Sequence, residues 1–500
     1  MSHKKRAVLN LVISLFTQGV IMVLGFVIPK IIMVNYGSDT NGLTGTISQI
    51  FAYVALLEAG IGQSTRNALY KYIYDDHIDK DSISKVMTIS RLYYRRVTKI
   101  YGVCVIGLAL VLPLVLQSDI PYSTIFFVTL FEGASGVLSF YFVQNWKMFL
   151  AANGKNYIIN SIELVFRILM YATKITLALL RVNIAVIQAG YLAVSVINLM
   201  LYYFYMRKNY SWIDYKAYSQ EVSLNDKNAY VITEVAWTVF SSTDMIVLSI
   251  FCSTKLSSVY SVYNLAILAI NGLLNAAYSS LSYILGQSFN KNHERYKSVH
   301  DSYNSIFMSA TTILMSVTVV LLPSFVKIYT KGVTDISYEN EWLPLLLCLV
   351  QMLSWSRYVA GNLSGVAGYA KNVSRISLAE ACMNVVFSVI LVNIWGITGV
   401  VLATVLALPM KAIYCNWLAE KVILKRKPYK TILIIGANFS VFFGAFIMSK
   451  VLVISIDSYA GFIAYGCLFT IGIATITALI NCIINKDIPS FLFKDRKRAF

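Results

Sequence analysis

The feature that most constrains this chain is a succession of apolar runs, each about as long as a membrane-spanning helix. A soluble domain normally carries about a quarter charged residues, whereas here 13% are charged and 57% are hydrophobic. Polar groups cannot cover the surface of such a chain, so the sequence predicts an all-α polytopic membrane protein with about fourteen spans of roughly 20 residues. The runs lie at 8–34, 42–66, 98–117, 122–147, 157–180, 183–206, 228–252, 258–286, 303–328, 342–368, 374–395, 397–420, 431–453 and 459–484.

The basic residues fall on one side of these spans. Of the 42 Lys and Arg residues, thirty-two lie in the two termini and in every second connection, five lie in the opposite connections, and five lie inside spans. Cytoplasmic segments of membrane proteins carry such an excess. The pattern predicts that both termini are cytoplasmic, and it explains the net charge of +18 without a nucleic-acid partner.

Two parts of the chain resemble each other at an offset of about 216 residues. AANGKNYIINSIELVF from Ala151 resembles GVAGYAKNVSRISLAEACM from Gly365. At the same offset, MVNYGSDTNGLTG from Met33 aligns with SIFCSTKLSSVYS from Ser249. The repeat predicts two pseudo-symmetric six-helix lobes of the same orientation with a central path between them, followed by two further helices. The predicted divisions are a first lobe at 1–206, a cytoplasmic linker at 207–227, a second lobe at 228–420, and helices 13 and 14 with a basic cytoplasmic tail at 421–500.

The largest cytoplasmic connection, 67–97, contains KDSISKVMTISRLYYRR. Its pattern predicts an amphipathic helix that lies along the inner membrane surface. Asp81 or Ser82 is the expected N-cap.

Several charged side chains lie inside the spans, where each costs about 2.5–3.5 kcal/mol and normally faces protein or water. Asn160, Glu163, Arg167 and Lys174 share one helical face, and Glu163 and Arg167 are spaced to pair. That pair is either structural or functional, and the polar stripe of span 8 either binds substrate or joins helices. The predicted substrate-binding residues are Lys30, Arg167, Lys174, Arg357, Asn271 and Asn275. The predicted counter-charges or proton or cation sites are Glu58, Glu132, Glu163 and Asp244.

The seven Cys residues show no paired spacing, and the four His residues lie in polar segments. No disulfide framework, metal site or cofactor is therefore expected. The outer connections are short and no His lies in a span, so an integral-membrane enzyme lacks groups for acid–base chemistry and is not expected. A basic, hydrated cavity instead favours an anionic, hydroxyl-rich solute such as a lipid-linked sugar phosphate.

The sequence also resembles a known family over nearly its whole length. The resemblance is carried by Asn10 and Gln18, by VIPKIIMVNYGSDTNGLTGTISQIFAYVALLEAGIGQSTRNAL from Val27, and by TDMIVLSIFCSTKLSSVYSVYNLAI from Thr243. These segments resemble the polysaccharide repeat-unit flippases (the O-antigen, capsule and exopolysaccharide, Wzx-type group) of the MOP superfamily, which are relatives of the MATE exporters. The family pattern often has a basic residue where Lys30 stands.

This resemblance implies a V-shaped, two-lobed bundle in a bacterial cell membrane. Such a protein moves undecaprenyl-diphosphate-linked oligosaccharide from the inner to the outer leaflet by alternating access, for cell-surface polysaccharide biosynthesis. The implied partners are this substrate, membrane lipids, and polysaccharide polymerase or assembly proteins, and a monomer suffices. The alternative is a MATE-type exporter of cationic drugs, which would favour an acidic cavity.

Overall fold

The computed structural model describes residues 3–74, 77–217, 227–291, 293–451, 456, 458–486 and 488. Residues 218–226 of the predicted linker, most of the C-terminal tail, and the side chains of Asn10 and Gln18 lie outside this description. The α-helices are α1 (His3–Ala55), α2 (Ile61–Tyr70), α3 (Lys80–Val115), α4 (Tyr122–Leu138), α5 (Gln144–Ala152), α6 (Asn156–Leu179), α7 (Ile184–Asn209), α8 (Lys227–Phe251), α9 (Thr254–Lys291), α10 (His293–Tyr329), α11 (Leu343–Trp355), α12 (Tyr358–Val366), α13 (Ala370–Trp417), α14 (Tyr429–Val451) and α15 (Tyr459–Ile484). The other elements are the 3-10 turn η1 (Leu56–Glu58), the π-helices η2 (Ser139–Val143) and η3 (Leu418–Ile423), and the strands β1 (Ile73–Tyr74) and β2 (His77–Ile78).

Two of the long helices each contain two helical segments. α1 is broken at Gly37 (φ 84°, ψ 170°) and α13 at Gly396 (φ 54°, ψ −130°). A side chain at either position would be strained, so glycine permits the turn. With these breaks counted, twelve of the fourteen predicted apolar runs each fall on one helical segment. The run 42–66 is interrupted between η1 and α2, and the run 342–368 between α11 and α12.

Within the described residues, ten helical stretches are long and apolar enough to cross a membrane. Large apolar side chains on their outer faces are exposed, for example Leu114 on α3 and Ile471 on α15. In a soluble protein such faces would be covered, so they are suited to lipid.

The chain divides into two compact units, residues Met1–Ser258 and Val259–Phe500. The division falls after the predicted linker because α8 packs along α1 and so belongs to the first unit. Arg181, between α6 and α7, and Gly396, at the break of α13, have positive φ values of 53° and 54°. These positions differ by about the repeat offset.

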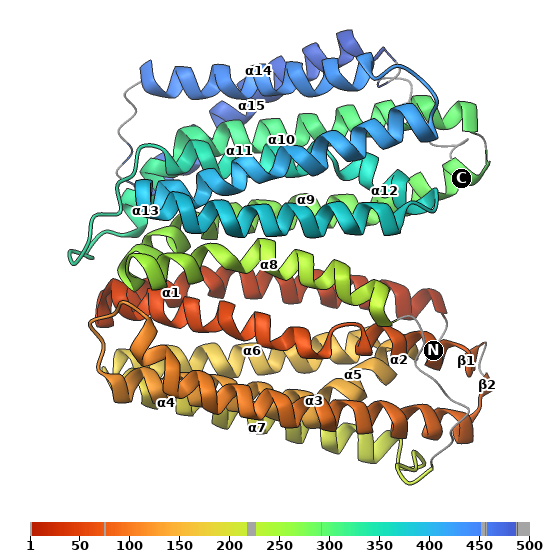
Figure 1. Ribbon diagram of the computed structural model, residues 1–500, viewed down its shortest axis with the longest axis vertical. Helices are drawn as coiled ribbons and strands as arrows, with labels where there is room; N and C mark the ends of the chain where they lie inside the picture. Colours follow the sequence, from red (N-terminus) through yellow and green to blue (C-terminus); the bar gives the residue numbers. More distant parts are fainter. Residues whose placement is uncertain are drawn as a thin grey trace. The chain divides into compact units, whose positions relative to one another are not determined.

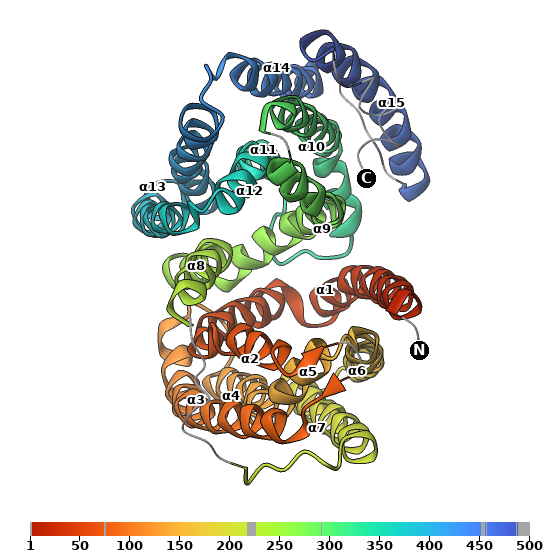
Figure 2. The same ribbon diagram turned by 90° about the vertical axis from the view of Figure 1, so that its right-hand side faces the viewer.

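In the first unit α1 packs against α6 and α8, while α4 lies between α3 and α7 (Figures 1 and 2). Its core includes Leu43, Tyr101 and Val128. A short antiparallel hairpin of β1 and β2 precedes α3, with Ile73 opposite Ile78. In the second unit α10 packs against α11, α14 and α15, and α13 covers α11 and α12.

The predicted surface helix within 67–97 was wrong in two respects: it is not a separate helix, and its N-cap is neither Asp81 nor Ser82. Residues from Lys80 continue without a break into the third span as the single helix α3, so they do not form a separate helix along the membrane. The N-cap is Asp79, whose side chain accepts from the Ser82 N–H at 3.1 Å. Ile83, Val86 and Met87 are fully buried in a core shared with α5 and α7, which explains why this face is apolar.

Candidate functional site

A polar cavity of about 280 Å³ lies inside the first unit. α3, α4, η2, α6 and α7 supply most of its wall, and α1 contributes Phe51. Five aromatic rings line it beside the charged groups: those of Phe51, Tyr101, Phe140, Phe166 and Tyr191. The cavity therefore combines apolar surface with a few placed polar groups, as ligand sites commonly do.

The π-helix η2 shapes one wall of this cavity. It interrupts the helix that continues from α4 into α5, and its residues Ser139, Phe140 and Val143 face the cavity. A π-helical turn inserts an extra residue into a helix and occurs frequently at functional sites. The extra residue changes which side chains of α5 face inward, and these include Gln144 and Lys147.

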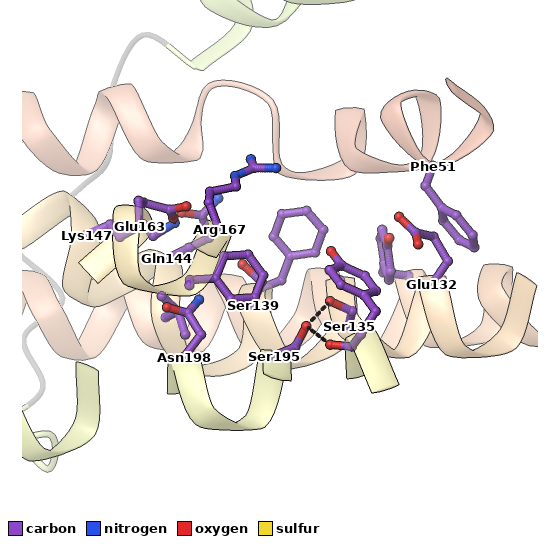
Figure 3. A pocket seen from close by; sticks show the side chains of 16 residues that line it. Phe51, Glu132, Ser135, Ser139, Gln144, Lys147, Glu163, Arg167, Ser195 and Asn198 are labelled. Atoms are coloured by element: carbon purple, nitrogen blue, oxygen red, sulfur yellow. Dashed lines mark hydrogen bonds and ion pairs between the residues drawn. The ribbon is translucent and has the colours of Figure 1, made fainter. Parts of the chain in front are cut away.

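One end of the cavity holds an ion pair between helices. Lys147 of α5 pairs with the Glu163 Oε1 of α6, and both side chains are about four-fifths buried. The prediction that Glu163 pairs with Arg167 was therefore wrong: the Arg167 guanidinium extends away from the Glu163 carboxylate (Figure 3). Arg167 forms no ion pair with any described residue, and its Nε is buried without a hydrogen-bond partner.

Glu58 lies in η1, where α1 gives way to α2. Its Oε1 accepts from the Gln144 amide of the cavity wall at 3.2 Å, and its Oε2 is buried without a hydrogen-bond partner. Gly60, two residues later and with a positive φ of 76°, is the N-cap of α2, and its N–H donates to Glu234 at 3.3 Å. The carboxylate in this apolar segment is thus directed toward the polar interior of the first unit.

The other end of the cavity holds Glu132 (Figure 3). Its carboxylate accepts a hydrogen bond from the Gln188 amide of α7. Ser135 and Ser195 hydrogen-bond each other at 2.7 Å beside it. Lys174 lies 4.7 Å from the centre of the Tyr191 ring, in a cation–π contact. Among the described residues, no carboxylate lies within ion-pair distance of the Lys174 ammonium.

The remaining predicted residues lie apart from this cavity. Lys30 is half-buried on α1, and Asp244 is buried on α8. In the second unit, Arg357 lies at the break between α11 and α12 and pairs with Glu380, which Lys411 also approaches at 3.9 Å.

The asparagines predicted on span 8 have different surroundings from each other. Asn271 accepts from the Trp355 indole at 3.0 Å, whereas Asn275 is exposed. Trp355 is itself buried, so the Asn271 contact joins two helices of the second unit.

Comparison with solved structures decides the fold. A multidrug resistance MATE family transporter of the MOP superfamily, in an inward-facing conformation, matches with a TM-score of 0.62 at 13% identity, over 80% of this chain and 94% of that one. The lipid II flippase MurJ, in an inward closed conformation, matches with a TM-score of 0.65 at 13% identity, over 98% of this chain and 100% of that one. The chain has the MOP transporter fold.

The same fold is found in a MOP superfamily transporter from Pyrococcus furiosus, with a TM-score of 0.56 at 14% identity, over 84% of this chain and 96% of that one. No protein-family model and no curated protein sequence matches this chain. The predicted fold class, an all-helical polytopic membrane protein with a MATE-like arrangement, is confirmed. These identities are low, so the MOP fold is what the likeness establishes.

Sequence reasoning missed two residues that line the cavity, Gln144 and Lys147, and one that hydrogen-bonds to its wall, Gln188. Gln144 and Gln188 are uncharged and stood out less than the carboxylates that they bind. Lys147 was counted among the basic residues of a cytoplasmic connection, yet it lines the cavity. Its position at the end of an apolar run, 16 residues before Glu163, was the available signal.

Proposed function

We propose that this chain is a transporter that flips oligosaccharides linked to a lipid by a diphosphate, from the inner to the outer leaflet, for cell-surface polysaccharide synthesis. The observation that carries the proposal is Arg167, a cation that lines a polar cavity of the first unit and has no carboxylate paired to it among the described residues. A guanidinium in this state offers several donors in a planar arrangement that suits phosphate oxygens.

The cavity also suits the sugar part of such a substrate. Ser139, Gln144 and Asn198 line the same space as Arg167, and amide and hydroxyl groups hydrogen-bond to sugar hydroxyls. Tyr191 and Phe166 add aromatic surface against which the apolar faces of sugars pack. Lys174, held on the Tyr191 ring, adds a second positive charge on α6.

The extent of the structural likeness supports a lipid-linked substrate. The lipid II flippase matches over 98% of this chain, whereas the MATE transporter matches over 80%. α14 and α15 follow the two predicted six-helix lobes. With them included, the flippase matches this chain over almost its whole length. We therefore place the chain closer to lipid-linked cargo than to soluble drugs, as a protein of a bacterial cell membrane with both termini in the cytoplasm.

We further propose alternating access, with the two predicted repeats moving against each other. Lys30, Arg357, Asn271 and Asn275 remain predicted substrate contacts. Arg357 is already paired with Glu380, so its charge is largely compensated within the second unit.

One observation favours a second candidate function, export of an organic cation. Glu132 lies in the cavity beside the aromatic rings of Tyr101 and Tyr191, and carboxylates with aromatic faces bind cations. The Glu132 carboxylate already accepts a hydrogen bond from Gln188, however, whereas Arg167 forms no ion pair with any residue that the structure describes.

The test is complementation of a strain from which the gene is deleted. Wild type, Arg167→Gln, and the control Lys208→Gln, an exposed residue at the end of α7, are expressed at matched levels in the membrane. We expect deletion and Arg167→Gln to leave lipid-linked oligosaccharide trapped inside, while Lys208→Gln restores surface polysaccharide. Unchanged polysaccharide in the deletion strain, with raised sensitivity to cationic dyes, would replace the flippase by the exporter.

A further inference from the structure

We propose that Glu163 is an internal competitor for the substrate: its carboxylate occupies the anion site of Lys147, and a phosphate group of the cargo displaces it. This inference rests on the proposed function, because it assigns the exchange to the same cavity. It makes Lys147 and Glu163 residues that set affinity and release, with opposite effects on binding.

The first argument is the position of Lys147. Its ammonium contacts the Glu163 carboxylate, and it also lies 5.7 Å from the centre of the Tyr202 ring, so two different groups hold it. Tyr202 is fully buried on α7 and cannot easily move. When Glu163 leaves, the aromatic face keeps the ammonium at the cavity wall, where an incoming anion can reach it.

The second argument is the balance of charge at this end of the cavity. Lys147 and Arg167 supply two positive charges, and Glu163 supplies the one carboxylate paired with either of them in the described structure. Glu58, the next acidic group, accepts instead from Gln144. A diphosphate that contacted both cations would compensate them more fully than Glu163 alone does.

The third argument is the set of polar atoms left without partners around the same space. The Nε of Arg167, the Oδ1 of Asn198 and the hydroxyl of Tyr202 are buried and have no hydrogen-bond partner in the structure. Buried polar groups are normally satisfied, so a group of them around a cavity indicates a place for water or a polar ligand. A volume of about 280 Å³ holds either.

The competition gives a carrier a means of releasing its cargo. Binding must break the Lys147–Glu163 pair, so part of the favourable phosphate interaction is offset. Release restores the pair, which lowers the free energy of the empty state. Removing Glu163 should therefore tighten binding and slow transport, whereas removing Lys147 should weaken binding and also reduce transport.

The experiment measures binding of inorganic pyrophosphate to the purified full chain in lipid nanodiscs by calorimetry. The variants are Lys147→Gln, Glu163→Gln, the double variant with both changes, and the control Lys208→Gln. We expect Lys147→Gln to weaken binding about tenfold or more, Glu163→Gln to tighten it several-fold, and the control to match wild type. The double variant should bind as weakly as Lys147→Gln, because the competitor has nothing left to compete for.

Each result bears on the proposal. Weaker or unchanged binding by Glu163→Gln, or no pyrophosphate binding by wild type, would overturn it. Complementation tests the proposed function separately. If wild type restores surface polysaccharide but Glu163→Gln binds pyrophosphate as tightly as wild type does, the proposed exchange is wrong and the proposed function still stands. Should Glu163→Gln not fold, Glu163→Asp keeps the charge with a shorter reach, and binding no tighter than wild type would equally overturn the exchange.

Discussion

At the scale of single residues, Gly42 lies so close to a neighbouring backbone segment that there is no room for a side chain. A Cβ at Gly42 would lie 1.7 Å from the backbone oxygen of Thr254, where α1 meets the start of α9. We expect Gly42→Ala to lower the free energy of unfolding by about 1–3 kcal/mol or more, because backbone must move. Gly107→Ala, a helical glycine with nothing within 4 Å, is the matched control and should be neutral or slightly stabilising. Thermal unfolding in detergent measures both, and equal melting temperatures would contradict the close approach.

Glu380 holds two cations in the interior of the second unit. It is buried, pairs with Arg357 and lies 3.9 Å from Lys411. Glu380→Gln leaves both charges without a carboxylate, and breaking a buried pair in this way costs about 3–5 kcal/mol. The expected result is a large drop in the melting temperature.

The matched control for Glu380→Gln is Lys450→Gln, which removes an exposed pair with Glu341. Exposed pairs contribute about 0–1 kcal/mol, so this variant should melt close to wild type. If Glu380→Gln also melted like wild type, Arg357 would not depend on Glu380, and its predicted role in binding substrate would gain weight.

The sequence predicted which residues are charged inside spans, but it did not predict how they pair. Spacing along one helix brings Arg167 near Glu163, whereas the actual partner Lys147 comes from the preceding helix. That pairing depends on the π-helical turn η2, which rotates α5 relative to α4. A period of 3.6 residues cannot anticipate such a turn, because one added residue changes the face on which every later side chain lies.

At the scale of elements, the Asp39 carboxylate joins the break in α1 to two other connections, the one between α3 and α4 and the one between α8 and α9. The buried Asp39 carboxylate accepts from the Ser118 hydroxyl at 3.0 Å, from the Asp119 N–H at 2.7 Å and from the Thr254 hydroxyl. Nearby, the Asn41 amide donates to the Ser258 hydroxyl at 2.8 Å. The break in α1 and the turn between α8 and α9 are the segments that the predicted sequence repeat aligns with each other, so these hydrogen bonds join elements that the repeat predicts to be equivalent.

If these hydrogen bonds close the outer side, removing the Asp39 charge should loosen it. Asp39→Asn keeps the shape but loses the charge-assisted hydrogen bonds, which are about twice as strong as neutral ones. We expect the partly buried Cys252, in the turn between α8 and α9, to react several-fold faster with a membrane-impermeant maleimide, measured by mass spectrometry.

Lys255→Gln serves as the control for this turn. It removes a pair with the exposed Asp119 at 2.7 Å without touching the Asp39 carboxylate. The Cys252 rate in this variant should equal that of wild type. A rate unchanged in Asp39→Asn as well would show that the carboxylate does not hold the two turns together.

Most elements could be predicted because a bilayer imposes a length on every apolar run. Twelve of the fourteen runs each fall on one helical segment, and the turns at Gly37 and Gly396 fall between predicted runs. The runs 42–66 and 342–368 are each divided by a turn that their apolar composition did not reveal. The start of α3 was a further exception. An amphipathic pattern shows that one face is apolar, but it does not say whether that face meets lipid or, as here, the core around Met87 and Phe149.

At the scale of the whole molecule, composition and charge asymmetry were sufficient for the membrane class, and the fold comparison agrees with it. The repeat predicted two lobes and two extra helices, and the MurJ structure matches over almost the full length. Substrate chemistry could not follow from that arrangement, because one fold carries drug exporters and a lipid II flippase alike. It has to be argued from the cavity, and chiefly from Lys147, Glu163 and Arg167.

The most direct measurement is flipping by the purified protein in proteoliposomes that contain undecaprenyl-diphosphate-linked oligosaccharide in both leaflets. The fraction of oligosaccharide reached by an external lectin, after the outer pool has been removed enzymatically, reports movement across the bilayer. The account predicts recovery of the outer pool with wild type and Lys208→Gln, and little recovery with Arg167→Gln. No recovery with wild type, in vesicles that do accumulate a cationic dye, would contradict it.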